Sequence, residues 1–226
     1  MTTIMRMEAN QPAPTKNRRS RLWYSLLIFL CMIGGLTAYF VLTGWQSSAN
    51  AATLITINIT AEVADINDPG NVLDGAVEVG DTIKGSYTYD STTPDSNEAS
   101  TVGDYQHSDP PNGIKLNVGE VLFRTDPSNV DFLVEIVNDH GDPASDNYLL
   151  RSHNNISNGP PVTHIAWQLD DPTLAALSSD DLPTVPPVLT DWQSVFGLTI
   201  EGEDFESGSS YLIRSHVTSA TKRGGE

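Results

Sequence analysis

Three aspartates with the chemistry of metal ligands, Asp139, Asp142 and Asp146, lie within one short polar stretch at residues 138–147. Calcium takes about six to eight oxygen ligands, and clustered Asp and Asn side chains in a loop supply them. The stretch therefore predicts a calcium site, although its spacing differs from that of an EF-hand. The alternative is a plain hairpin turn, because the glycine and proline within the stretch suit a turn equally well.

A six-residue sequence that carries arginine and histidine occurs twice, as YLLRSH at 148–153 and as YLIRSH at 211–216. Side chains two residues apart point to the same face of a β-strand, so each copy presents its arginine beside its histidine. If the two strands are neighbours, they form a surface suited to a carboxylate or an acidic sugar, since arginine binds carboxylates bidentately. The alternative is that the arginines neutralise nearby acidic residues. The candidate ligands are Arg151, His153, Arg214 and His216.

Trp192 is the candidate for stacking against a sugar ring. It follows a proline-rich stretch at 183–187, which predicts an exposed position for the indole. Trp167, in contrast, alternates with apolar residues and is expected in the core. Trp192 therefore favours a carbohydrate-binding module as one interpretation of the chain.

No catalytic motif occurs in the sequence. Nucleophile elbows, H-E-x-x-H, Cys/His metal spacings and phosphate-binding glycine loops are all absent from it. Glycoside hydrolysis uses a pair of carboxylates, and the many acidic residues of the chain offer many such pairs. No single pair is therefore evidence for a hydrolase. The sequence predicts a protein that is not an enzyme, with a glycosidase-like hydrolase as the most distant alternative.

The charge of the chain divides sharply along its length. Residues 1–21 hold five basic residues and one acidic residue, whereas residues 52–226 hold seven basic and 28 acidic residues. Such an acidic surface repels nucleic acid and anionic lipid, which excludes both as expected partners of this part. It suits a soluble domain or one that binds divalent cations.

An uncharged apolar segment at 22–45 separates these two parts. As a helix it would be about 36 Å long, enough to span a membrane, and the basic head at 1–21 predicts that its N-terminal end stays in the cytoplasm. Residues 22–51 then form either a transmembrane anchor or a signal peptide that is cleaved after Ala51, where small residues make an A-x-A site. The single cysteine, Cys31, lies in this segment, so the exported part has no disulfide.

The exported part at 52–226 has the length of one domain and the pattern of a β protein. Residues 54–63 alternate apolar and polar side chains, the period-2 signature of a half-buried strand. Further strands are predicted near 83–89, 114–124, 130–137, 148–153, 164–169, 194–200 and 210–219, with a polar loop at 90–104. Short strands separated by Gly, Pro, Asn and Asp predict an all-β, antiparallel sandwich of the jelly-roll kind.

Two motifs resemble segments of exported bacterial proteins of the PEP-CTERM group. The segment GSYTYDSTTPDSNEASTVGDY at 85–105 is similar to a strand and loop of that group, and LDDPTLAALSSDDLPTVPPVL at 169–189 is similar to a second motif. The resemblance spans roughly 54–219 and implies export and a β-rich fold, with no established activity. The C-terminal sorting tag that defines the group is absent from this sequence, so the apolar segment at 22–45 would supply any membrane attachment.

Together these observations predict a secreted or membrane-tethered, non-enzymatic protein of the bacterial surface or extracellular matrix. Its expected partners are the membrane, through 22–45 if this segment is not cleaved, and polysaccharide or surface proteins. Calcium is the only cofactor that the pattern suggests. The alternative function is that of a carbohydrate-binding module.

Overall fold

Alternating apolar and polar residues form β-strands through most of the chain that the computed structural model describes, residues 53–193 and 197–224. The only helical segment among these residues is the short 3-10 helix η1 (Leu189–Asp191). None of the described helices is long and apolar enough to cross a membrane. The basic head and the apolar segment expected at 1–51 lie outside the described residues. The strands are β1 (Leu54–Asn67), β2 (Thr82–Asp90), β3 (Val102–His107), β4 (Gly113–Val118), β5 (Val121–Thr125), β6 (Asp131–Gly141), β7 (Ala144–His153), β8 (Asn155–Ser157), β9 (His164–Asp171), β10 (Leu198–Asp204) and β11 (Ser209–Lys222).

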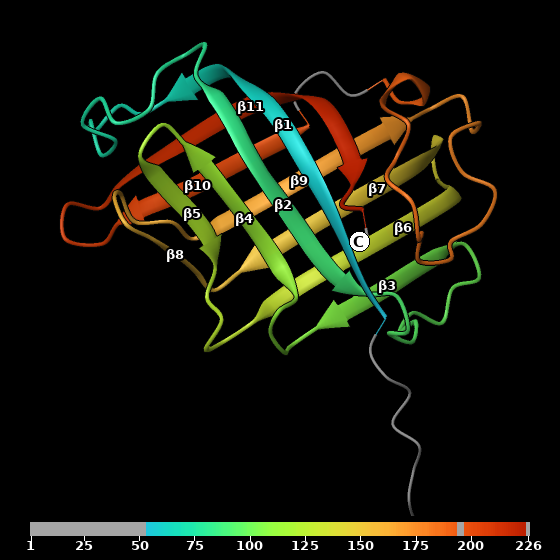
Figure 1. Cartoon of the computed structure of the whole chain (residues 1–226). Helices are drawn as coiled ribbons and strands as arrows, with labels where there is room; N and C mark the ends of the chain where they lie inside the picture. Colours follow the sequence, from blue (N-terminus) through green and yellow to red (C-terminus); the bar gives the residue numbers. More distant parts are fainter. Residues whose placement is uncertain (1–52, 194–196, 225–226) are drawn as a thin grey trace, which may run out of the picture. The chain divides into compact units, whose positions relative to one another are not determined.

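These strands form one 11-stranded sheet in the order β3-β6-β7-β9-β10-β11-β1-β2-β4-β5-β8. Every pairing in the sheet is antiparallel. Figure 1 shows that the sheet curls, so that β1, β2 and β4 cross over β9, β7 and β6. The side chains on the inner face of one half therefore meet those of the other half.

The two halves are joined by a cluster of aromatic side chains. Tyr87 of β2 and Tyr148 of β7 share a hydrogen bond between their hydroxyls at 2.9 Å. The Trp167 ring of β9 meets both tyrosines edge-on, with ring centroids 5.8 Å and 5.9 Å away. All three side chains are fully buried, so they seal the core between the facing halves. The all-β antiparallel class is confirmed, but a single sheet curled into a half-barrel takes the place of two separate sandwich sheets.

Most of the expected strands are present. Of the strand expected at 194–200, residues 194–196 lie outside the described part of the chain, and β10 begins at Leu198. The exceptions have physical reasons. The run expected at 114–124 is a hairpin of β4 and β5, because Gly119 turns the chain with a φ of 56°. Residues 102–104, expected in a loop, begin β3, whose inward-facing residues are Gly103, Tyr105 and His107. That inward set lacks the aliphatic residues by which sequence periodicity is recognised.

A long segment at 172–192 follows β9 and packs its apolar side chains against the core. The Tyr89 hydroxyl of β2 donates a hydrogen bond to the Pro183 carbonyl at 2.6 Å. The Tyr105 hydroxyl of β3 donates another to the Asp180 carbonyl at 2.9 Å. The two segments quoted above for their motifs, 85–105 and 169–189, are therefore in direct contact.

Candidate binding site

The three aspartates of the expected calcium site lie at the tip of the β6–β7 hairpin, but they differ in their surroundings. Asp139 and Asp142 are exposed, whereas Asp146 is buried. The Asp146 carboxylate accepts hydrogen bonds from the Asp139 backbone N–H at 2.9 Å and from the Leu177 backbone N–H at 3.0 Å. Asp146 thus ties the hairpin to the 172–192 segment.

No group of three or more His, Cys, Asp or Glu side chains within 53–193 and 197–224 has the arrangement of a metal site. Calcium also binds backbone carbonyl oxygens, which these side chains do not include. Calcium binding by the 138–147 turn therefore stays a prediction. The buried position of Asp146 has a structural explanation that needs no metal.

The Arg and His residues of the repeated sequence do not come together, because β9 and β10 lie between β7 and β11. Cross-strand register places Arg151 and Arg214 in one row on the outer face, with Ala166 and Thr199 between them. Arg151 lies 3.9 Å from Glu135, and Arg214 forms a 2.7 Å ion pair with Asp65. Each arginine therefore has its own carboxylate, as the neutralising interpretation predicts.

The two histidines of the repeat are also apart. His153 stacks on His164 of β9 with ring centroids 4.8 Å apart, and His164 lies 3.7 Å from Glu201. Burial and the neighbouring His153 lower the pKa of His164, and Glu201 partly offsets this. His216 instead lines a small hollow of about 50 Å³ beside Trp192.

Trp192 does not have the exposure that a sugar platform requires. Its relative exposure is 9%, and its ring packs edge-on against Tyr148 with centroids 6.4 Å apart. The exposure expected from the preceding prolines is wrong, because Trp192, at the C-terminal end of η1, belongs to the hydrophobic core.

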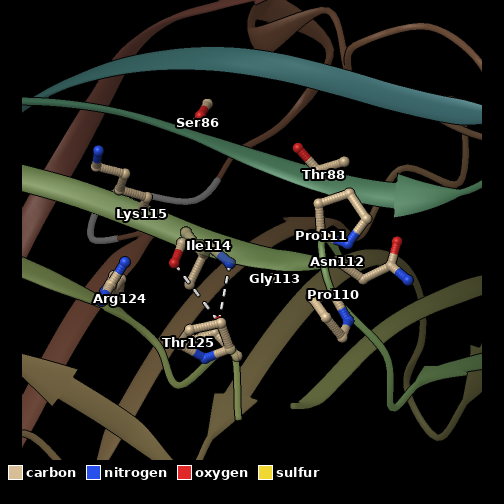
Figure 2. A pocket seen from close by; sticks show the side chains of 11 residues that line it. Ser86, Thr88, Pro110, Pro111, Asn112, Gly113, Ile114, Lys115, Arg124 and Thr125 are labelled. Carbon is tan, nitrogen blue, oxygen red and sulfur yellow. Dashed lines mark hydrogen bonds between the residues drawn. The ribbon is translucent and has the colours of Figure 1, made fainter. Parts of the chain in front are cut away.

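A different set of cations gathers on the outer face of β2, β4 and β5. The β4–β5 hairpin places Lys115 directly opposite Arg124, and β2 places Ser86 opposite Lys115. These side chains border a hollow of about 310 Å³, shown in Figure 2 and called the cationic pocket below. It is lined by Ser86, Thr88, Pro110, Pro111, Asn112, Gly113, Ile114, Lys115, Arg124, Thr125 and Pro127.

The electrostatics of the cationic pocket are opposite to those of the rest of the domain. No acidic residue lines it, and neither Lys115 nor Arg124 has an ion-pair partner among the described residues. Asp126 lies close to the rim. Hydrogen bonds from Ser128 lower the pKa of Asp126, and Arg124 adds a smaller effect in the same direction. Two cations are thus left available to an anionic ligand.

The floor of the cationic pocket is held by buried hydrogen bonds. The Thr125 hydroxyl accepts a hydrogen bond from the Ile114 backbone N–H at 2.9 Å and shares another with the Ser152 hydroxyl at 2.7 Å. Gly113 has a φ of 133°, and a Cβ there would come within 2.6 Å of the Thr125 hydroxyl oxygen. Glycine is therefore required for β4 to pass this close to β5.

The sequence contained a signal for this site that the strand prediction missed. With 114–124 taken as one strand, Lys115 and Arg124 are nine positions apart on opposite faces. Recognising Gly119-Glu120 as a two-residue hairpin turn places the same two residues opposite each other on one face. The contributions of Ser86 and the 110–112 loop depend on tertiary pairing and had no local signal.

No family model, curated protein or solved structure matches this chain. The resemblance to the PEP-CTERM group thus rests on the two quoted motifs and stays a prediction. Any function proposed for the chain must come from the geometry of its own residues.

Proposed function

We propose that the exported part is a non-enzymatic, adhesive domain of a secreted or membrane-tethered surface protein, and that its cationic pocket binds an acidic glycan. The observation that carries the proposal is the Lys115–Arg124 pair, which borders a hollow of about 310 Å³ without any acidic residue in its lining. The surrounding domain has 28 acidic and seven basic residues in 52–226. Two of these seven basic residues therefore border the same hollow, and neither has an ion pair among the described residues.

The lining supports an acidic sugar in particular. The Arg124 guanidinium suits a carboxylate through two parallel hydrogen bonds, and the Lys115 ammonium adds a second positive charge. The hydroxyls of Ser86 and Thr88 and the amide of Asn112 suit the ring hydroxyls of a sugar. The acidic surface elsewhere disfavours nucleic acid, because a phosphate backbone needs an extended basic footprint.

The proposal concerns binding and assigns no catalytic residue. Glycoside hydrolysis uses a pair of carboxylic acids that flank the scissile bond, and the lining of the cationic pocket contains no Asp or Glu. A surface protein that holds acidic polysaccharide would link its membrane or matrix attachment to the surrounding polymer. This agrees with the role expected from the sequence.

The test is calorimetric titration of the full-length protein, in a neutral detergent, with a uronic-acid oligosaccharide. We expect Lys115→Gln and Arg124→Gln each to weaken binding about 10- to 100-fold, because a hydrogen bond to a charged group contributes roughly 1.5–3 kcal/mol. Arg223→Gln is the matched control, since it removes one exposed positive charge outside the lining. Equal affinities of all four proteins would refute the proposal.

A further inference from the structure

A second hollow of about 310 Å³ lies next to the cationic pocket and shares three of its lining residues, Pro110, Pro111 and Asn112. It is referred to below as the acidic hollow. A ligand that occupies one hollow therefore lies beside the entrance of the other. The remaining lining of the acidic hollow is Leu54, Asp90, Thr93, Gln106, His107, Ser108 and Asp109.

The chemistry of the acidic hollow differs from that of its neighbour. It contains no Lys or Arg and has two carboxylates, Asp90 and Asp109. One Asp90 oxygen already accepts hydrogen bonds from the backbone N–H groups of Thr53 and Thr92, at 3.0 Å and 2.9 Å. The exposed Asp109 carboxylate has no hydrogen bond or ion pair among the described residues, so it can accept hydrogen bonds from a ligand.

Asn112 lies where the two hollows meet. Its side-chain N–H donates a hydrogen bond to the Asp109 carbonyl at 2.9 Å, which orients the amide. Its side-chain oxygen is buried and has no hydrogen-bond partner. The junction of the two hollows is therefore shaped by Asn112 and by Pro110 and Pro111, which line both of them.

We propose that the two hollows bind consecutive residues of one glycan, an acidic sugar in the cationic pocket and a neutral sugar in the acidic hollow. The inference rests on the proposed function, and it adds the order in which acidic and neutral sugars follow each other in the glycan. Carboxylates accept hydrogen bonds from neutral hydroxyls, but Asp90 and Asp109 repel a second uronate. The ligand class is a polysaccharide in which uronic acids alternate with neutral sugars.

The test compares two probes of equal charge on the full-length protein in neutral detergent. One is a hyaluronan hexasaccharide, in which three glucuronates alternate with neutral N-acetylglucosamine, and the other is trigalacturonate, in which three uronates are contiguous. We expect the alternating probe to bind at least about tenfold more tightly. Asp109→Asn should raise the affinity for trigalacturonate several-fold, because it removes one repulsive charge. Glu206→Gln removes an exposed charge at the β10–β11 turn and is the matched control.

The outcomes separate the two proposals. Equal affinities for both probes, together with no effect of Asp109→Asn, would overturn the two-hollow inference. The acidic-glycan function would still stand in that case if the Lys115 and Arg124 variants weaken binding. Failure of both probes to bind would refute the acidic-glycan function itself, and the inference with it. Tighter binding of the contiguous probe would assign the acidic hollow no role in recognition.

Discussion

At the scale of single residues, His107 is the buried titratable group with the clearest consequence. Its ring lies near Tyr89 and Phe132, with centroids 6.4 Å and 6.0 Å away, and its Nδ1 shares a 3.1 Å hydrogen bond with the Thr93 hydroxyl. Its Nε2 is buried without a partner, which fits a neutral imidazole whose proton is on Nδ1. Burial lowers the pKa of His107 to about 4 from its ordinary 6.5.

This shift makes the stability of the fold depend on pH. Below pH 6.5 the unfolded chain binds a proton at His107, whereas the folded chain does not until about pH 4. The contribution of His107 to stability is therefore present above pH 6.5 and is lost progressively between pH 6.5 and 4. At pH 5 the loss is about 2 kcal/mol relative to pH 7.5.

We predict that His107→Gln removes this part of the pH dependence. The free energy of unfolding, from urea titrations at pH 7.5 and 5, should fall by about 2 kcal/mol less in the variant than in the parent protein. The quantity compared between the two proteins is the change in the free energy of unfolding from pH 7.5 to pH 5. A destabilisation by the substitution that is the same at both pH values therefore cancels. His140→Gln, at an exposed position on β6, is the control. An unchanged pH dependence in His107→Gln would show that another group causes it.

At the scale of elements, the 172–192 segment depends on side chains that reach it from distant strands. Tyr89 and Tyr105 bind its carbonyls, the Lys222 ammonium donates to the Thr184 carbonyl at 3.0 Å, and Asp146 accepts from Leu177. The segment itself contains only the three-residue helix η1. Its position is thus set by hydrogen bonds from outside rather than by its own backbone pairing.

We predict that Asp146→Ala destabilises the domain whether calcium is present or chelated. Two backbone N–H groups lose their acceptor, which costs about 3 kcal/mol and lowers the melting temperature by roughly 6–12 °C. Thermal melts in millimolar calcium and in chelator measure this. If the turn instead binds calcium, Asp142→Ala should lower the melting temperature in calcium alone. An effect of Asp146→Ala that disappears in chelator would favour the metal over the anchoring role.

The strands could be predicted from the sequence, but their partners could not. Alternation reveals β1 because Ile55, Ile57 and Ile59 all face inward. No local pattern predicts that the Tyr87 and Tyr148 hydroxyls share a hydrogen bond, since the two residues are 61 positions apart. The same holds for the site, where the hairpin pairing of Lys115 and Arg124 had a turn signal and the approach of the 110–112 loop had none.

At the scale of the whole molecule, the excess of acidic residues in 52–226 opposes the proposed binding of an acidic glycan. The acidic residues repel an acidic glycan over distances comparable with the Debye length, about 30 Å at 0.01 M salt and 8 Å at 0.15 M. The proposed contacts of Lys115 and Arg124 with a glycan carboxylate would act over a few Å, where salt screens them much less. Raising the salt concentration should therefore weaken the long-range repulsion more than the contacts within the pocket.

This predicts a salt dependence opposite in sign to that of a basic glycan-binding protein. The association rate with a hyaluronan hexasaccharide should rise several-fold between 0.01 and 0.15 M salt, because fewer encounters are repelled. The dissociation rate should change little, since it reflects the short-range contacts. Surface plasmon resonance of the full-length protein at a series of salt concentrations measures both rates. An association rate that falls with salt would contradict this prediction. It would mean that the positive potential of the cationic pocket, rather than the negative net charge of the domain, governs the encounter with the ligand.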